Sequence, residues 1–252
     1  MAQAQQDPSK LVAMITGASR GIGRAIALEL ASAGVTVAVL ARAHRGRPDR
    51  LDKVVSEIEL LGGRAMAVRA DLRESAQVAA AVGQVLKRLG RIDLLVNNAG
   101  VFGGELQTTE VAPVIWRKVL ATNLDGAFYC AAAVVPGMLT RGRGIIVNIS
   151  SGAAVRTGFL NIAYGVSKAG LDRLTLGLHA EFGDAGLSCV SLSPPVTATE
   201  TVRRLYRDQD TEGLAPPELT ARALRRLLEI GPQRYGGQVV AVREFLREQG
   251  ML

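Results

Sequence analysis

Aromatic residues are scarce in this chain. Phe, Trp and Tyr together make up 4% of its 252 residues, whereas 48% are hydrophobic and the mean hydropathy is +0.19. With so few rings, a core must consist mainly of Ala, Val, Leu and Ile, a composition that suits helices packed on an aliphatic parallel sheet. The length is sufficient for one α/β domain with a large core.

Cysteine and histidine are nearly absent. The two cysteines, Cys130 and Cys189, lie in apolar segments without a second cysteine or a histidine at ligand spacing. We expect both to be buried and reduced, as in a cytoplasmic protein. The two histidines, His44 and His179, have no acidic neighbour at ligand spacing. The sequence therefore predicts no metal site.

Long tracts of one charge and long apolar runs are also missing. The net charge is +7, but the arginines are scattered and no basic run alternates with aromatics, so we expect no nucleic-acid partner. The longest apolar run, 127–139, contains Pro136-Gly137 and is too short to cross a membrane. Residues 1–10 are polar, unlike a signal peptide, and we expect a disordered tail on a soluble, cytoplasmic protein.

The chain alternates instead between short apolar runs and segments of helical periodicity. We predict strands at 11–15, 35–40, 64–69, 92–96, 145–149, 187–192 and 238–242, and helices at 22–30, 51–60, 78–89, 111–121, 124–139 (ending near Pro136-Gly137) and 161–182. Right-handed crossovers turn this order into a parallel sheet covered on both faces. We therefore predict one α/β domain over residues 11–252, a Rossmann-type doubly wound sheet of about seven strands. Segment 197–217 fits no regular element and is predicted to form a mobile flap over the site.

A glycine-rich turn follows the first predicted strand. "TGASRGIG" (16–23) places Gly17, Gly21 and Gly23 between that strand and a helix. Glycine lets the backbone turn tightly against a pyrophosphate, and the helix N-terminus offers free N–H groups and partial positive charge. A glycine-rich turn without a ligand is the alternative, but its place in the first strand–helix unit favours a dinucleotide site.

The end of the second predicted strand indicates which dinucleotide. A free ribose 2'-hydroxyl usually meets a carboxylate there, yet no acid lies between positions 29 and 49. Arg42, Arg45 and Arg47 occur instead, and Arg20 lies in the turn. Because a guanidinium suits a 2'-phosphate, we predict NADP(H) in preference to NAD(H).

Tyr164 and Lys168 are four residues apart on a predicted helix and therefore share one face. Such a pair is often only a surface contact. However, Ser150 and Ser151 end the fifth predicted strand, where side chains of an open α/β sheet face the ligand crevice. An ammonium about 4 Å from a phenolate stabilises it by roughly 4 kcal/mol at an effective dielectric near 20, or about three pKa units. We therefore expect the Tyr164 pKa to fall from near 10 toward neutrality.

Together these motifs resemble those of the classical short-chain dehydrogenases/reductases. The resemblance covers about residues 10–200 and rests on TGASRGIG, Asp71, "NNAG" (97–100), Asn123 in "ATNLDGAF", Ser151 in "NISS", and Tyr164-x-x-x-Lys168. It implies that Tyr164 is the general acid or base and that Ser151, rather than Ser150, bonds the substrate carbonyl. It also implies that Lys168 holds the nicotinamide ribose and that Asn123 anchors a proton-relaying water.

The same resemblance implies a set of cofactor contacts. They come from the turn, the strand ends and the segment after the sixth strand: Gly17, Ser19, Arg20, Gly21, Ile22, Gly23, Arg42, Asp71, Leu72, Asn97, Asn98, Ala99, Gly100, Tyr164, Lys168, Pro194, Val196, Thr197 and Thr199. Helix capping is the alternative for Asp71, and a cap or kink for Asn123. The chain departs from the family at Pro195, where glycine is usual, and lacks the Asp-Gly-Gly that often follows the last strand.

The expected function is hydride transfer between NADP(H) and a small carbonyl or secondary alcohol substrate. The resemblance further implies a homotetramer or homodimer, built on the long helices at 124–139 and 161–183. Hydride chemistry belongs to the nicotinamide, so no metal is needed. One alternative is 3-oxoacyl-[acyl-carrier-protein] reduction, with Arg141, Arg143 and Arg173 facing the acidic carrier protein. Another is an NADP-binding module without catalysis.

Overall fold

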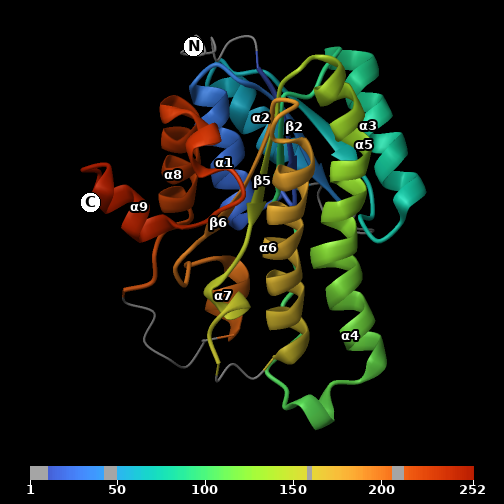
Figure 1. Ribbon diagram of the computed structural model, residues 1–252, viewed down its shortest axis with the longest axis vertical. Coiled ribbons are helices and arrows are strands. Elements are labelled where there is room, and N and C mark those ends of the chain that lie inside the picture. Colours follow the sequence, from blue (N-terminus) through green and yellow to red (C-terminus); the bar gives the residue numbers. More distant parts are fainter. Residues whose placement is uncertain (1–10, 43–49, 158–160, 206–212) are drawn as a thin grey trace.

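A single parallel sheet forms the centre of the molecule, which is a computed structural model (Figure 1). The structure describes residues 11–42, 50–157, 161–205 and 213–252, and in this part of the chain seven parallel strands lie in the order β3-β2-β1-β4-β5-β6-β7. The strands are β1 (Val12–Thr16), β2 (Thr36–Ala41), β3 (Ala65–Arg69), β4 (Leu94–Asn97), β5 (Gly144–Ile149), β6 (Leu187–Ser193) and β7 (Val239–Ala241). The sheet order reverses between β1 and β4, and open α/β sheets bind ligands at such a switch point.

Helices cover both faces of the sheet, because successive strand residues point to opposite sides. Ala13 and Ile15 of β1 pack with α1, α2 and α8, whereas Val12 and Met14 pack with α3 and α5. The helices are α1 (Gly21–Ser32), α2 (Arg50–Leu60), α3 (Ser75–Leu89), α4 (Pro113–Leu120), α5 (Gly126–Thr140), α6 (Ile162–Phe182), α7 (Glu200–Leu205), α8 (Pro217–Ile230) and α9 (Val242–Glu248). The predicted doubly wound α/β fold is confirmed, and the seven strand boundaries lie within two residues of those predicted.

The expected helix end at Pro136-Gly137 is wrong. Helix α5 continues through both residues to Thr140, whose hydroxyl donates to the Pro136 carbonyl at 3.0 Å. Pro136 is exposed, so the carbonyl that loses its partner one turn earlier lies on the solvent side of the helix. The two helices predicted at 111–121 and 124–139 are likewise continuous, since a π-helical segment, Ala121–Asp125, joins α4 to α5.

The segment predicted as an irregular flap is more ordered at its ends. It contains α7, and Thr197 forms a parallel bridge with Ala215, so the two ends of the segment lie side by side. Helix α8 was not predicted from the sequence, although its buried Leu219, Ala223 and Leu227 have helical spacing and pack on α1. The central part of the flap, 206–212, and the predicted tail, 1–10, lie outside the described residues.

One helical run is long and apolar enough to cross a membrane by length and composition alone. It comprises α4, the π-helical segment and α5, Pro113–Thr140, with a mean hydropathy of 1.3 in its most apolar window. Because 44% of that window is buried inside the protein, the run is also consistent with a core helix. Cys130 on α5 and Cys189 on β6 are free and buried, as expected, and burial raises the pKa of each thiol to about 12.

Candidate active site

A cleft of about 970 Å³ opens at the carboxyl ends of the strands, beside the switch point between β1 and β4. Most of the residues predicted as cofactor contacts or catalytic groups line it: Gly17, Ser19, Arg20, Gly21, Ile22, Arg42, Asp71, Leu72, Asn98, Ala99, Gly100, Ser151, Tyr164, Lys168, Pro194, Val196, Thr197 and Thr199. Three predicted residues, Gly23, Asn97 and Asn123, do not line it.

The turn after β1 adopts a backbone that only glycine tolerates well. Gly17 and Gly21 have φ angles of +66° and +54°, in the left-handed region. A Cβ on Gly17 would lie 2.7 Å from the Cα of Ala99, a backbone atom that cannot move aside. A Cβ on Gly23 would lie 2.4 Å from the side-chain nitrogen (Nδ2) of Asn98, so glycine at this position lets the Asn98 side chain pack against the turn.

Hydrogen bonds tie the end of β4 to the end of β1. The Thr16 hydroxyl accepts from the backbone N–H groups of Asn98 and Ala99, at 3.0 and 3.1 Å, and the Asn98 side chain donates to the Thr16 carbonyl at 2.9 Å. Asn97 was expected to line the cofactor site, but its side chain points into the core and donates to Asn148 at 2.9 Å. Successive strand residues face opposite ways, so only one of the two asparagines can reach the cleft.

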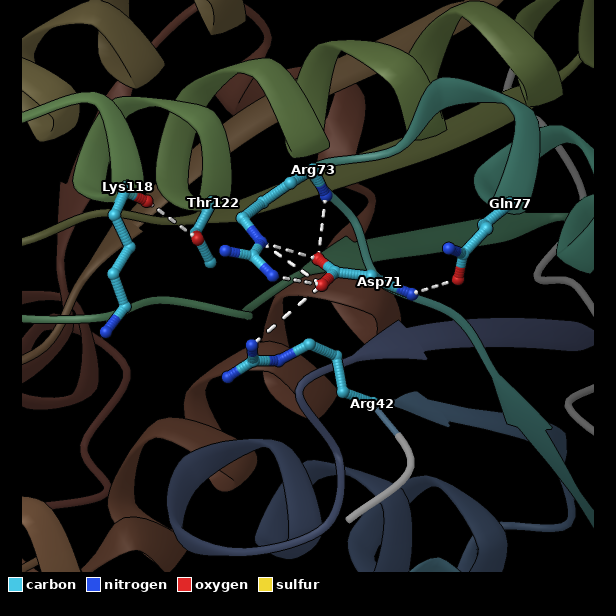
Figure 2. A network of polar contacts seen from close by, with 6 residues as sticks. All are labelled: Arg42, Asp71, Arg73, Gln77, Lys118 and Thr122. Carbon is cyan, nitrogen blue, oxygen red and sulfur yellow. Dashed lines mark hydrogen bonds and ion pairs between the residues drawn. The ribbon is translucent and has the colours of Figure 1, made fainter. Parts of the chain in front are cut away.

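Figure 2 shows a polar network at the ends of β2 and β3. Arg73 donates to both oxygens of the Asp71 carboxylate from its Nε and Nη2, at 2.5 to 3.1 Å, and the Arg42 guanidinium lies 3.9 Å from the same carboxylate. The Gln77 side chain accepts from the Asp71 backbone N–H at 2.9 Å. The hydrogen bond from Arg73 lowers the pKa of Asp71, so this carboxylate is ionised at neutral pH. Arg45 and Arg47 lie outside the described residues.

Tyr164, Lys168 and Ser151 converge on the cleft from α6 and the end of β5. Lys168 is almost fully buried, and its ammonium donates to the Ile149 carbonyl at 2.7 Å and lies 5.7 Å from the centre of the Tyr164 ring. The Ser151 hydroxyl accepts from the backbone N–H of Ala153 at 3.2 Å. Phe102, which the sequence analysis missed, packs edge-on against Tyr164 with ring centres 5.3 Å apart.

The expected fall of the Tyr164 pKa toward neutrality is wrong for this structure. Burial raises the pKa of Tyr164, and the side-chain contact with Ser151 opposes that rise only in part. The Lys168 ammonium donates to the Ile149 carbonyl and lies 5.7 Å from the centre of the Tyr164 ring, so burial decides the direction of the Tyr164 pKa shift. Burial also lowers the pKa of Lys168, to about 8, while the negative charge of Asp172, one helical turn further, opposes this.

Asn123 lies inside the π-helical segment and is buried. Its side chain accepts from the Val101 N–H at 2.8 Å and donates to the Val101 carbonyl at 3.0 Å and to the Ser167 hydroxyl at 3.0 Å. The side chain therefore joins the segment after β4 to α6, next to Lys168. Single π-helical turns within α-helices are frequent at functional sites.

The segment after β6 closes one side of the cleft. Pro195 occupies the position where the resemblance led us to expect glycine, and its carbonyl accepts from the Thr197 hydroxyl at 2.7 Å. Thr199 caps α7, because its hydroxyl accepts from the Val202 N–H at 3.2 Å. Glu200, at the start of α7, pairs with Arg50 at 2.7 Å, so α7 is tied to α2 across the cleft.

Two of the arginines suggested for a carrier protein lie far from the cleft. Arg141 and Arg143 are in the turn before β5, at the amino ends of the strands, whereas the residues that line the cleft lie at the carboxyl ends. Arg141 is partly buried and donates to the Ile92 carbonyl at 2.6 Å, so its guanidinium serves the fold. Arg173 is exposed on α6 but does not line the cleft.

The residues around the cleft fit a dinucleotide cofactor. The glycine turn leaves no room for side chains, the α1 N-terminus faces the cleft through Gly21 and Ile22, and Arg42 stands at the end of β2. Among the described residues no group of three or more His, Cys, Asp or Glu side chains could hold a metal ion.

Comparison with known proteins identifies relatives over most of the chain. The family described as short chain dehydrogenase matches residues 11–210. A 3-oxoacyl-[acyl-carrier-protein] reductase of Staphylococcus epidermidis is 35% identical over 198 residues, which are 78% of this chain and 79% of that protein. Two solved structures are similar throughout.

The first is a Beutenbergia cavernae protein, provisionally described as an NAD(P)-dependent gluconate 5-dehydrogenase with NADP bound at low occupancy. It has a TM-score of 0.84 and 33% identity over 92% of this chain and 94% of its own. The second is a 7α-hydroxysteroid dehydrogenase in complex with NADH and 7-oxo glycochenodeoxycholic acid. It has a TM-score of 0.82 and 27% identity over 94% of this chain and 95% of its own.

Proposed function

Since the chain belongs to the short-chain dehydrogenase/reductase family, and is thereby an oxidoreductase acting on CH–OH or C=O groups, we propose that it transfers hydride between NADP(H) and a small carbonyl or secondary alcohol substrate. The observation that carries the proposal is that Ser151, Tyr164 and Lys168 line the same cleft as the glycine turn after β1. The nicotinamide, when bound, supplies or accepts the hydride. The protein then has to orient the substrate and move one proton.

Tyr164 is the proton donor in the reductive direction. Burial raises its pKa, so the phenol is protonated at neutral pH, which is the form that can donate a proton to a carbonyl oxygen. Ser151 hydrogen-bonds that oxygen and positions it beside the phenol. Lys168, protonated below a pKa of about 8, orients the cofactor ribose, and Asn123 holds Val101 and Ser167 in place behind it.

NADP(H) is the proposed cofactor, with the 2'-phosphate bound by Arg42. Its guanidinium is half-exposed at the end of β2, and Asp71 is already paired with Arg73, so Arg42 is free to turn toward a phosphate. Asp71 and Leu72 then lie against the adenine, and Asn98 to Gly100 line the adjoining wall. That the B. cavernae relative holds NADP supports this assignment, whereas the steroid dehydrogenase holds NADH.

A second candidate is reduction of 3-oxoacyl groups on acyl carrier protein. It is supported by the S. epidermidis reductase, which is 35% identical. The arginines that could face an acidic carrier are those at the rim of the cleft, such as Arg204 on α7, rather than Arg141 or Arg143.

The protein is further proposed to act in the cytoplasm as a homotetramer or homodimer built on α5 and α6. Exposed apolar side chains on both helices support this assembly, since Phe128 is 51% and Leu176 49% exposed in the single chain. Light scattering tests the assembly, and a stable monomer would contradict it.

The function is tested by NADPH oxidation with a panel of ketones, quinones and 3-oxoacyl thioesters. We expect turnover by the wild-type protein and a loss of about 10² to 10⁴-fold in Tyr164→Phe, with NADPH binding retained. Tyr129→Phe, at a tyrosine on α5 that does not line the cleft, is the matched control. Tight NADPH binding without turnover of any compound would instead indicate a non-catalytic NADP-binding module.

A further inference from the structure

The arginines that line the cleft differ in whether a carboxylate neutralises them. Arg20 and Arg50 share Glu200, at 3.5 and 2.7 Å, and Arg42 lies 3.9 Å from Asp71. All three belong to the part of the cleft formed by α1, α2 and the end of β2, where the phosphates and the adenosine of a dinucleotide would lie.

The remaining arginines of the cleft wall are different. Within the described part of the chain, the side chains of Arg156 and Arg204 have no hydrogen-bond or ion-pair partner, and the Arg243 side chain makes one long hydrogen bond, 3.5 Å, to the Gly213 carbonyl. Glu244 also lines the cleft, but it follows Arg243 in the chain and the two charges offset each other. The part of the cleft wall formed by the segments after β5, β6 and β7 therefore carries positive charge that the described residues do not neutralise.

Arg156 is the cleft arginine that lies closest to Ser151 along the chain. A 3-10 turn, Gly152–Ala154, begins directly after Ser151, and the backbone N–H of Arg156 donates to the Gly152 carbonyl at 2.9 Å. The Arg156 side chain folds back over this turn, so that its Nε and Cζ lie 3.4 and 3.6 Å from the point where a Cβ on Gly152 would stand. The guanidinium consequently lies beside the residue that follows Ser151, in the cleft that Tyr164 also lines.

This arrangement contributes little to the stability of the fold. The Arg156 side chain is exposed and makes none of the ion pairs that hold α2, α7 and β3 in place. A planar guanidinium with several free N–H donors suits a carboxylate, which it can bind through two parallel hydrogen bonds. Arg156 lines the same cleft as Ser151 and Tyr164, so a substrate bound beside these two residues lies in the cleft that Arg156 lines.

We propose that Arg156 binds a carboxylate carried by the substrate, so that the protein acts on oxo acids or hydroxy acids in preference to neutral ketones and alcohols. This inference rests on the proposed oxidoreductase function and names the substrate class of the same site. The carboxylate takes no part in the hydride or proton transfer and is unchanged by the reaction. Its role is to fix the substrate so that the carbonyl oxygen meets Ser151 and Tyr164.

The test compares oxo acids with their own methyl esters, which differ in charge and little else. The ligands are 4-oxopentanoate, 5-oxohexanoate and the two esters. Calorimetry with the NADP⁺-loaded protein, which cannot reduce them, gives the dissociation constants, and NADPH absorbance in a separate assay gives kcat/KM. A charge-assisted hydrogen bond contributes about 1.5–3 kcal/mol, so we expect the wild-type protein to prefer each acid to its ester by about 10 to 150-fold, and Arg156→Gln to show almost no preference.

Two further variants make the result specific. Arg156→Lys keeps the charge but loses the planar fork, so it should recover part of the preference for the acids. Arg88→Gln removes one positive charge from the exposed side of α3, away from the cleft, and should leave the acid-to-ester ratio unchanged. NADPH affinity should be the same in all variants.

Equal binding of acid and ester by the wild-type protein, or no binding of either acid, would overturn the inference. So would an equal loss for acid and ester in Arg156→Gln, or a weakened affinity for NADPH, which would assign the guanidinium to the cofactor. Turnover of the esters without any preference for the acids would refute this inference and leave the oxidoreductase function intact. Acid binding that depends on Arg156, but without NADPH consumption, would refute the proposed function and support the carboxylate site.

Discussion

Arg42→Ala should change the cofactor preference of this protein without unfolding it. The Arg42 side chain is 43% exposed, and its nearest ionic contact, to Asp71, is 3.9 Å long. Asp71 keeps its bidentate partner Arg73 in the variant, so no carboxylate is left unpaired. The substitution therefore removes a positive charge from the end of β2 and little else.

The expected loss of NADPH affinity follows from the position and exposure of Arg42. Two unit charges about 4 Å apart at an effective dielectric near 20 attract by roughly 4 kcal/mol. Since Arg42 is nearly half-exposed, we discount this to the range of a hydrogen bond to a charged group, about 1.5–3 kcal/mol. The dissociation constant for NADPH should then rise about 10 to 150-fold, because 1.4 kcal/mol corresponds to a factor of ten.

Fluorescence titration with NADPH and with NADH measures the effect directly. NADH has no 2'-phosphate, so its affinity should be nearly unchanged in Arg42→Ala. Arg88→Ala, on α3 outside the cleft, controls for the change in net charge. An equal loss of affinity for both nucleotides, or no loss for NADPH, would refute the assignment of Arg42 to the 2'-phosphate.

Three further predictions concern stability. Burial lowers the Lys168 pKa to about 8 from 10.5, so between these pH values the unfolded chain binds more protons than the folded one. The free energy of unfolding should therefore rise with pH across that window, by on the order of 3 kcal/mol relative to Lys168→Met, as measured by urea unfolding. Gly17→Ala should lower the free energy of unfolding by at least about 2 kcal/mol, because φ is +66° and the new Cβ would meet the Ala99 backbone at 2.7 Å. Asp93→Asn should cost about 3 kcal/mol in the same assay, because the buried carboxylate accepts from the Val12 N–H at 3.0 Å and from Arg91 at 2.5 Å.

Each of these has a result that contradicts it. If the free energy of unfolding changed with pH in the same way for the wild-type protein and Lys168→Met, burial would not lower the pKa of the Lys168 ammonium. The groups that both proteins share, including the buried thiols, cancel in that comparison. A Gly17→Ala protein of wild-type stability would mean that the turn can relax. An Asp93→Asn protein of wild-type stability would mean that the negative charge of the Asp93 side chain does not contribute to the free energy of unfolding.

The order of elements and the positions of several cleft residues were already contained in the sequence. Hydrophobic periodicity distinguishes the strands from the helices along the chain. Strands that alternate with helices form a parallel sheet covered on both faces, so the seven strands can be predicted from local sequence patterns. Residues within two positions of a strand's carboxyl end, such as Gly17, Asp71 and Ser151, must lie near that edge of a parallel sheet, and all three line the cleft. The helix α8 could also have been found, from Leu219, Ala223 and Leu227.

Other features depend on which groups meet in space. Chain spacing puts Tyr164 and Lys168 on one helical face, but only the fold decides that the ammonium bonds the Ile149 carbonyl and that burial raises the phenol pKa. Asn97 and Asn98 are neighbours in sequence, and strand orientation sends one into the core and the other to the cleft.

Arg156 is one of many scattered arginines in the sequence. The contact of its side chain with Gly152 depends on the conformation of the turn after Ser151, which the sequence does not reveal. Local patterns determine secondary structure because they depend on neighbouring residues, whereas pKa values and free charges depend on the dielectric surroundings and partners that distant segments bring together.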